Sequence, residues 1–114
     1  MRDDTARVLD IVLACRDIGA FLADVDRERF LGDRMLQNAV CRSPGIVGEA
    51  ARMVSDEFKA AHPQVPWAEM VGLRNRITHE YLRIKLDVVW RIATRDVPLL
   101  LGATEPLVPP ENPP

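Results

Sequence analysis

Four side chains that can act on a phosphodiester lie within eight residues of this chain, between Arg74 and Tyr81. Arg74 can hold a phosphate through paired hydrogen bonds and stabilise negative charge that develops on it. His79 carries an imidazole, which titrates near neutral pH and can move a proton. Asn75 and Tyr81 add a carboxamide and the chain's only phenol. Because no cluster of metal-ligand residues accompanies them in the sequence, these residue types favour metal-free chemistry.

The spacing of this segment limits how it can work on a helix. Residues five apart lie about 140° apart around an ideal α-helix, so Arg74 and His79 would point in different directions. Asn75 and His79 are four apart and share one face. Two arrangements would bring Arg74 to His79: a helix that ends near His79, or a site to which two subunits contribute. The sequence leaves both arrangements open.

Helical periodicity runs through almost the whole chain and defines the elements that must position the segment. A first apolar stripe recurs at three- and four-residue steps from Val8 to Val25, which is the pattern of one helix face. Asp3 or Asp4 can cap the start of that helix, where an acidic side chain suits the helix dipole. No segment alternates as a strand would, so we expect an all-α fold.

A second apolar stripe runs from Leu36 to Ala61 and keeps its phase across Pro44. Proline inside a helix removes one hydrogen bond and bends or breaks the helix. One interpretation is a long helix from about Asp33 to Ala61 with a kink near Pro44. The other is two helices, with Ser43 as the cap and Pro44 as the first residue of the second helix. The retained phase favours the kinked helix.

Proline-rich residues 62–66 form a connector, and a helix follows it from about Trp67. A last helix is predicted from about Leu86, with Pro98 near its end. Trp67 and Trp90 fall at apolar helical positions and are expected to be core or interface anchors. Together the stripes predict an antiparallel up-and-down bundle of four to five helices.

The 114 residues fit one domain. We expect the bundle to span residues 1–104 and a Pro-rich tail of polyproline character to span 105–114. Cys15 and Cys41 form no metal-binding pattern and are expected to be buried thiols. A domain of this size has a modest core, so oligomerisation would add useful burial.

The formal charge of -2 gives the chain no overall basic field for nucleic acid. A local basic patch could still form from the cationic residues around the segment, which are Arg74, Arg76, Arg83 and Lys85. The chain opens with acidic residues and contains no apolar run long enough to span a bilayer. We therefore expect a cytoplasmic protein that does not bind membranes.

The order Arg-x-x-x-x-His-x-Tyr, from Arg74 to Tyr81, resembles the signature of a known family. It is similar to that of the HepT-like branch of the HEPN superfamily, the toxin half of HEPN/MNT toxin–antitoxin modules. The similarity covers most of the chain up to Leu101 and includes Ala39-Val40, Arg42, Ile46–Ala51, His62–Trp67, Gly72-Leu73, Leu86–Trp90 and Asp96–Pro98. The chain departs from the family pattern at Pro44-Gly45, Glu80 and Lys85.

This resemblance implies a metal-independent endoribonuclease that needs no cofactor. Arg74 would clamp the scissile phosphate, and Asn75 would orient the imidazole or the phosphate. His79 would act as general base to the ribose 2′-hydroxyl or as acid to the leaving 5′-oxygen, giving a 2′,3′-cyclic phosphate. One histidine cannot easily fill both roles. We therefore expect a two-fold homodimer that brings two motifs into one groove.

The resemblance also implies a regulatory role for Tyr81. In the family, a partner nucleotidyltransferase of the MNT type attaches adenylyl groups to the tyrosine of this motif. Added phosphate would put negative charge where an RNA phosphate must bind. The expected partners are therefore RNA, the nucleotidyltransferase antitoxin and a second copy of the chain. Glu80 adds a carboxylate beside the site, which leaves the catalytic efficiency open.

Each residue also has an ordinary structural explanation. Arg74 could form a salt bridge with Glu49 or Glu69, and Glu49 could instead orient Arg74 or Arg42 from behind the site. His79 could bond the last carbonyls of a helix. The alternative function is a non-catalytic, dimeric helical module that binds RNA or scaffolds the nucleotidyltransferase.

Overall fold

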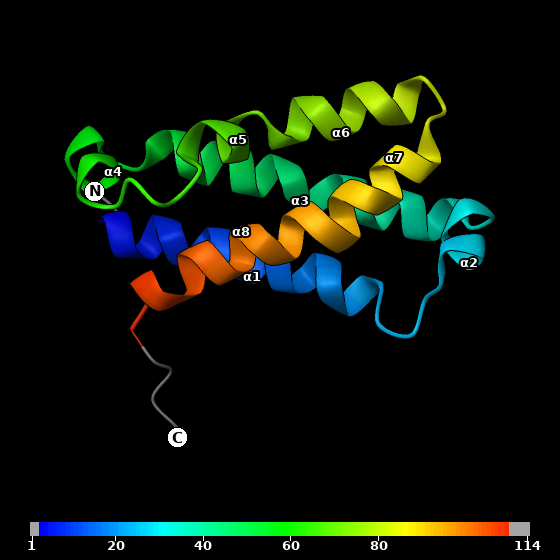
Figure 1. The fold of residues 1–114 in the computed structure, drawn as a ribbon, viewed down its shortest axis with the longest axis horizontal. Helices are drawn as coiled ribbons and strands as arrows, with labels where there is room; N and C mark the ends of the chain where they lie inside the picture. Colours follow the sequence, from blue (N-terminus) through cyan, green and yellow to red (C-terminus); the bar gives the residue numbers. More distant parts are fainter. Residues whose placement is uncertain (1–2, 110–114) are drawn as a thin grey trace.

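The computed structural model describes residues 3–109, and no strand occurs within that range. The expected all-α bundle is confirmed. Its elements, drawn in Figure 1, are α1 (Asp4–Phe21), α2 (Arg27–Leu31), α3 (Arg34–Met53), α4 (Asp56–Ala61), α5 (Trp67–Val71), α6 (Leu73–Leu82), α7 (Leu86–Arg91), the π-helical turn η1 (Ile92–Asp96), α8 (Val97–Thr104) and the 3₁₀ turn η2 (Glu105–Leu107).

Four helical rods make up the bundle: α1, α3, the pair α5–α6, and the run α7–η1–α8. Figure 1 shows α3 in the middle, with α5–α6 along one side of it and α1 along the other. The α8 helix packs on α1, and the short α2 helix packs on α7 and α3. The core between the rods is formed by Val8, Ile11, Val12, Ile18, Val40, Val47, Met70, Leu73, Ile77, Val89, Ile92, Val97 and Leu100.

The first helix begins as predicted, because the Asp3 carboxylate accepts a hydrogen bond from the Ala6 N–H at 2.8 Å. It ends at Phe21, however, four residues before Val25. The predicted stripe still packs toward the core at that point, since Leu22 and Val25 are partly buried against it. The apolar periodicity therefore predicts a helix that is too long, because the residues after the end of α1 are also packed against the core.

The prediction of one helix from Asp33 to Ala61 is half right. Asp33 caps α3, and the helix continues through the buried Pro44 without interruption. It ends at Met53 rather than Ala61, because Val54 takes an extended conformation and Ser55 caps a new helix, α4. Two hydrogen bonds from Ser55 to the Asp4 carboxylate, at 2.8 Å and 2.6 Å, tie this break to α1 and lower the pKa of Asp4.

The short helix α2 was missed by the sequence analysis. Asp26 caps it by accepting a hydrogen bond from the Arg29 N–H at 2.8 Å. The buried Gln37 amide on α3 donates to the carbonyl oxygens of Phe30 and Leu31, at 2.9 Å and 3.2 Å. A buried polar side chain thus completes the end of α2 and locks it to α3.

The α5–α6 rod runs antiparallel to α3 and is interrupted only at Gly72. Three contacts fix the register between them: Gly48 with Val71, Gly45 with Arg74, and Asn38 with Tyr81. A Cβ on Gly48 would lie 3.0 Å from the Val71 carbonyl oxygen. A side chain at this position would force the Val71 backbone to shift, so glycine favours the close approach of α3.

The last rod is longer than predicted. The helix does not end near Pro98 but continues through α8 to Thr104. Proline lacks an N–H and its ring clashes with the carbonyl four residues earlier. The wider turn η1 lies just before Pro98, and in it the Val97 N–H bonds to the Ile92 carbonyl, which accommodates the proline.

Described residues of the expected tail dock on the bundle. Leu107 and Val108 pack against the core, and Glu105 forms a 3.0 Å ion pair with Arg16. Residues 110–114 of that tail lie outside the described residues.

The two cysteines are free thiols. Cys15 is buried and Cys41 is half-buried, and removal from water raises the pKa of these thiols to about 12 and about 11. The prediction of buried, unpaired cysteines is therefore confirmed for Cys15 and partly for Cys41.

Candidate functional site

Arg74 lies exposed on α6, and its side chain runs over Gly45 of α3. A Cβ at position 45 would meet Arg74 Cδ at 3.4 Å, an ordinary van der Waals distance, so the arginine stem lies directly over this residue. Within residues 3–109, Arg74 forms no ion pair, and neither Glu49 nor Glu69 reaches it. Its guanidinium therefore has its hydrogen-bond donors available for an anion from outside the chain.

His79 lies one and a half turns further along α6 and is 60% exposed. Its Nε2 atom is 3.4 Å from Arg83 Nη1 and 3.9 Å from Glu80 Oε1. The helix continues to Leu82, so the arrangement in which it ends near His79 is wrong. On an unbroken α-helix, Arg74 and His79 of one chain project about 140° apart. The length of α6 therefore favours the arrangement to which two subunits contribute.

Asn75 is exposed on the same helix, and its side chain forms no hydrogen bond within the described residues. It lies four residues before His79, which places both on one face of α6. An amide and an imidazole are thus presented together to solvent.

Tyr81 has a partner that the sequence did not indicate. Its hydroxyl donates a 3.0 Å hydrogen bond to Asn38 Oδ1 on α3, and its ring packs partly buried against the core. The two residues lie 43 positions apart, and only the register of α3 against α6 brings them together. The phenol is therefore held in one orientation at the surface.

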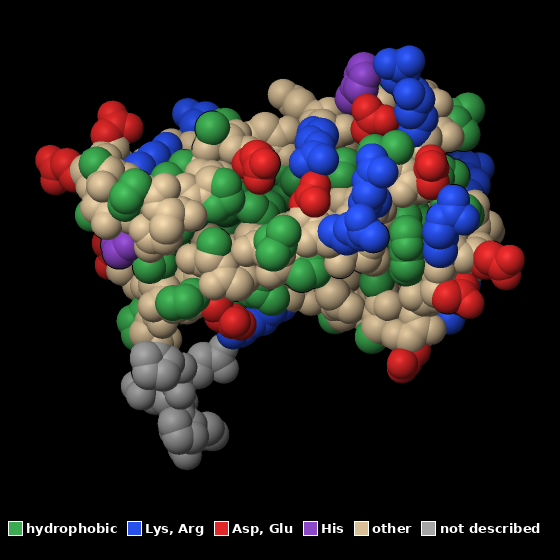
Figure 2. Space-filling view, viewed as in Figure 1, with side chains coloured by type: hydrophobic (Ala, Val, Ile, Leu, Met, Phe, Trp, Pro, Cys, Tyr) green, Lys and Arg blue, Asp and Glu red, His purple; other side chains and the backbone are tan. Residues whose placement is uncertain are grey.

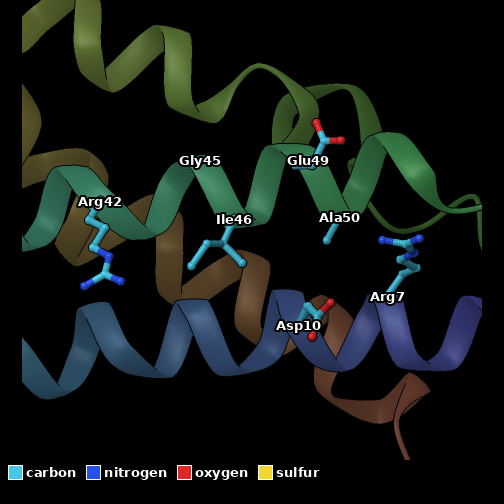
Figure 3. A pocket seen from close by; sticks show the side chains of 7 residues that line it. All are labelled: Arg7, Asp10, Arg42, Gly45, Ile46, Glu49 and Ala50. Carbon is cyan, nitrogen blue, oxygen red and sulfur yellow. The ribbon is translucent and has the colours of Figure 1, made fainter. Parts of the chain in front are cut away.

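Glu49 does not take the supporting role considered for it. Its carboxylate binds Arg52 at 2.7 Å, and that ion pair lowers the pKa of Glu49. Figure 3 shows its carboxylate pointing up from α3, away from α1. Glu49 also borders a hollow of about 340 Å³ between α1 and α3, into which Arg42 and Arg7 reach (Figure 3). None of the four motif residues lines that hollow.

Basic side chains surround the motif. Arg76 is neutralised by Asp96 of η1 at 2.8 Å, which also fastens α6 to the last rod. Arg74, Arg83 and Lys85 form no ion pair in the described part of the chain. Figure 2 shows Lys and Arg side chains gathered on the face of the molecule that it draws, over the end that carries α6 and α7.

An apolar patch lies at the same end of the bundle. Met35, near the start of α3, is 81% exposed, and Leu82 and Ile84, at the end of α6 and just after it, are 74% and 79% exposed. The hydrogen bond between Asn38 and Tyr81 shows that these two helix ends lie side by side. Ile84 follows α6 with φ of 59°, and Lys85 N–H bonds to the Glu80 carbonyl at 2.9 Å. This is the turn that normally ends a helix on glycine. A β-branched residue there is strained, so the chain keeps an exposed isoleucine at an energetic cost.

Residues 3–109 lack both a cluster of metal-ligand side chains and a membrane-spanning helix. No group of three or more His, Cys, Asp or Glu side chains is placed so that it could hold a metal ion. No helix in this range is long and apolar enough to cross a membrane.

Comparison with known protein families shows which family the chain belongs to. The model of the family described as "Ribonuclease HepT-like" matches residues 11–107, which include every motif residue. The chain belongs to the HepT-like ribonuclease family. The predicted membership of the HepT-like family is thereby confirmed.

Relatives within the HepT-like family are similar over almost their whole length. A protein of Methanocaldococcus jannaschii named "putative RNase" is 40% identical over 104 residues, which cover 91% of this chain and 95% of that protein. The "probable ribonuclease HepT" of Thermococcus cleftensis is 37% identical over 98 residues, covering 86% and 89%. No match was found among solved structures.

Proposed function

We propose that this chain is a metal-independent endoribonuclease that acts through Arg74 and His79. The observation that carries the proposal is an unpaired, exposed guanidinium and an exposed imidazole on one helix of a HepT-like ribonuclease chain. RNA cleavage by the purified chain in the presence of chelator, compared with His79→Ala, tests it.

The reaction needs one proton acceptor and one proton donor. His79 of one subunit takes the proton of the ribose 2′-hydroxyl, and the freed oxygen attacks the neighbouring phosphorus. The bond from phosphorus to the 5′-oxygen breaks, and the protonated His79 of the other subunit gives that oxygen its proton. Arg74 holds the non-bridging oxygens as negative charge builds on them. The products are a 2′,3′-cyclic phosphate and a free 5′-hydroxyl.

A homodimer is required for this scheme. Arg74 and His79 of one chain point in different directions on α6, so an Arg74 of one copy must meet a His79 of the other. A two-fold axis near α6 would set two motifs in one groove. The exposed patch of Met35, Leu82 and Ile84 beside the motif offers apolar surface for such a contact.

The Ile84→Asn substitution should separate the stability of the chain from its dimerisation. Asparagine tolerates positive φ far better than isoleucine. The free energy of unfolding of the monomer should therefore rise by about 1 kcal/mol, and its melting temperature should rise by about 4 °C. Loss of the exposed side chain should weaken the dimer. Thermal unfolding at a concentration where the chain is monomeric, together with sedimentation equilibrium, measures the two effects.

Met35→Gln is the matched control, because it removes apolar surface from the patch without relieving backbone strain. It should weaken the dimer and leave the melting temperature of the monomer unchanged. A wild-type chain that is monomeric at micromolar concentration contradicts the dimer. If Ile84→Asn dimerises as tightly as wild type, the patch lies outside the interface.

The proposal extends to a toxin–antitoxin module in which a partner nucleotidyltransferase adenylylates Tyr81. The Tyr81 hydroxyl lies at the surface, where the Asn38 amide holds it. It follows Arg74 by seven residues, about two helical turns, so both side chains lie on one face of α6 and a phosphate attached to Tyr81 would lie on the same side as Arg74. Phosphate on Tyr81 would then compete with RNA phosphate for the same donors.

A further inference from the structure

A second basic site lies away from the motif, between α2, α7 and η1. It is a hollow of about 350 Å³ lined by Arg27, Asp87, Trp90, Arg91, Thr94 and Arg95. Three guanidinium groups share it with one carboxylate. None of the motif residues belongs to it.

The charge of this hollow is not compensated. In the part of the chain that the structure describes, Arg27, Arg91 and Arg95 form no ion pair. Arg52 and Arg76, in contrast, are bound to Glu49 and Asp96, respectively. Three unpaired arginines and one acid leave the hollow strongly positive, which suits a ligand with more than one negative charge.

The scaffold around these arginines is rigid. The Trp90 ring packs on the fully buried Phe30, with the ring centroids 5.4 Å apart. The Thr94 hydroxyl donates to the Trp90 carbonyl at 2.8 Å inside the π-helical turn. Turns of this kind often occur at functional sites. Arg91 and Arg95 lie on either side of Thr94 in sequence, so the turn sets the spacing of their side chains.

The charge distribution along the sequence links the hollow to the motif. Between Arg74 and Asp96 the chain has six basic and three acidic residues, whereas the rest of the chain has nine basic and fourteen acidic ones. One of the three acids, Asp96, is paired with Arg76. This segment forms α6, α7 and η1, and α6 packs against α7. A polyanion held at the motif would therefore continue over a positive surface toward the hollow.

We propose that this hollow binds the phosphodiester backbone of the RNA strand outside the cleavage site. The inference rests on the proposed function for its choice of RNA. Arginine binds phosphate bidentately, and bases stack on aromatic and guanidinium planes. Trp90 beside Arg91 and Arg95 offers both contacts, which favours a nucleic acid strand over an acidic protein surface.

The test measures RNA binding by fluorescence anisotropy with a His79→Ala chain, which should not cut the probe. Adding Arg91→Gln and Arg95→Gln should weaken binding of a single-stranded RNA of about 16 nucleotides by about tenfold. The slope of log K against log salt should fall by about 1.4, because each lost phosphate contact removes about 0.7 for single strands. The control pair, Arg29→Gln with Arg34→Gln, removes the same charge outside the hollow and should keep the slope.

An unchanged affinity and salt slope in the Arg91/Arg95 variant would overturn the proposal. Polyglutamate that binds as tightly as RNA, with the same loss in the variant, would assign the hollow to an acidic protein instead. AMP that displaces the RNA at micromolar concentration would assign it to a free nucleotide. If RNA binds through the hollow but the wild-type chain does not cleave it, the proposed function fails and this site stands.

Discussion

His79→Ala should lower the rate of RNA cleavage by about 10²–10⁴-fold, the usual loss when a proton-transfer group is removed. Arg74→Ala should cost about 10²–10³-fold, as expected for a donor that stabilises charge in the transition state. Both residues are exposed, so both variants should keep the wild-type helix content and melting temperature. Cleavage of a labelled RNA under single-turnover conditions measures these rates.

His62→Ala is the matched control for the imidazole. His62 is the only other histidine, and it lies in the connector, where its ring contacts Phe58. This variant should cleave RNA at the wild-type rate, and chelator should not slow either protein. Cleavage that needs added magnesium, or normal cleavage by His79→Ala, would contradict the assignment of catalysis to this motif.

Tyr81→Phe should abolish adenylylation by the partner nucleotidyltransferase, because phenylalanine lacks the oxygen that attacks the nucleotide. Tyr81 is the only tyrosine in the chain, so the intact mass after co-expression with the partner and ATP reports the event almost completely. The variant loses one surface hydrogen bond to Asn38, which should cost about 1 kcal/mol. It should still fold, cleave RNA and escape neutralisation.

Asn38→Ala separates the hydroxyl from its partner. This variant keeps the Tyr81 oxygen and removes only the group that holds it, so it should still gain mass in the presence of the nucleotidyltransferase. If Tyr81→Phe is still neutralised while the partner's catalysis is required, another hydroxyl carries the modification.

Much of the fold could be predicted from the apolar periodicity, and the errors in the predicted helix bounds have local causes. The stripe that ran from Leu36 to Ala61 gave the right buried face but hid the break at Ser55, because α4 continues the apolar pattern after a new cap. Pro44 and Pro98 were expected to bend or end helices. The structure keeps both within helices, and a π-helical turn stands before Pro98.

The candidate site was predictable as a list of residues, but its arrangement was not. The spacing of Arg74 and His79 posed the choice between a helix end and two subunits, and the length of α6 favours two subunits. The contacts of Tyr81 with Asn38 and of Arg74 with Gly45 depend on packing between distant segments. Glu49 was considered as support for Arg74, yet its nearer neighbour Arg52 binds it.

Mixing wild-type and His79→Ala subunits tests most directly whether two copies of the chain share one catalytic groove. After exchange of subunits at fixed total protein and a ninefold excess of the variant, only wild-type homodimers have both imidazoles. Activity should then fall to about 1% of the wild-type value, the square of the wild-type fraction, for a closed two-fold dimer. Activity of about 10%, proportional to the wild-type fraction, would show that one His79 is enough for each site and would contradict a groove that needs two imidazoles.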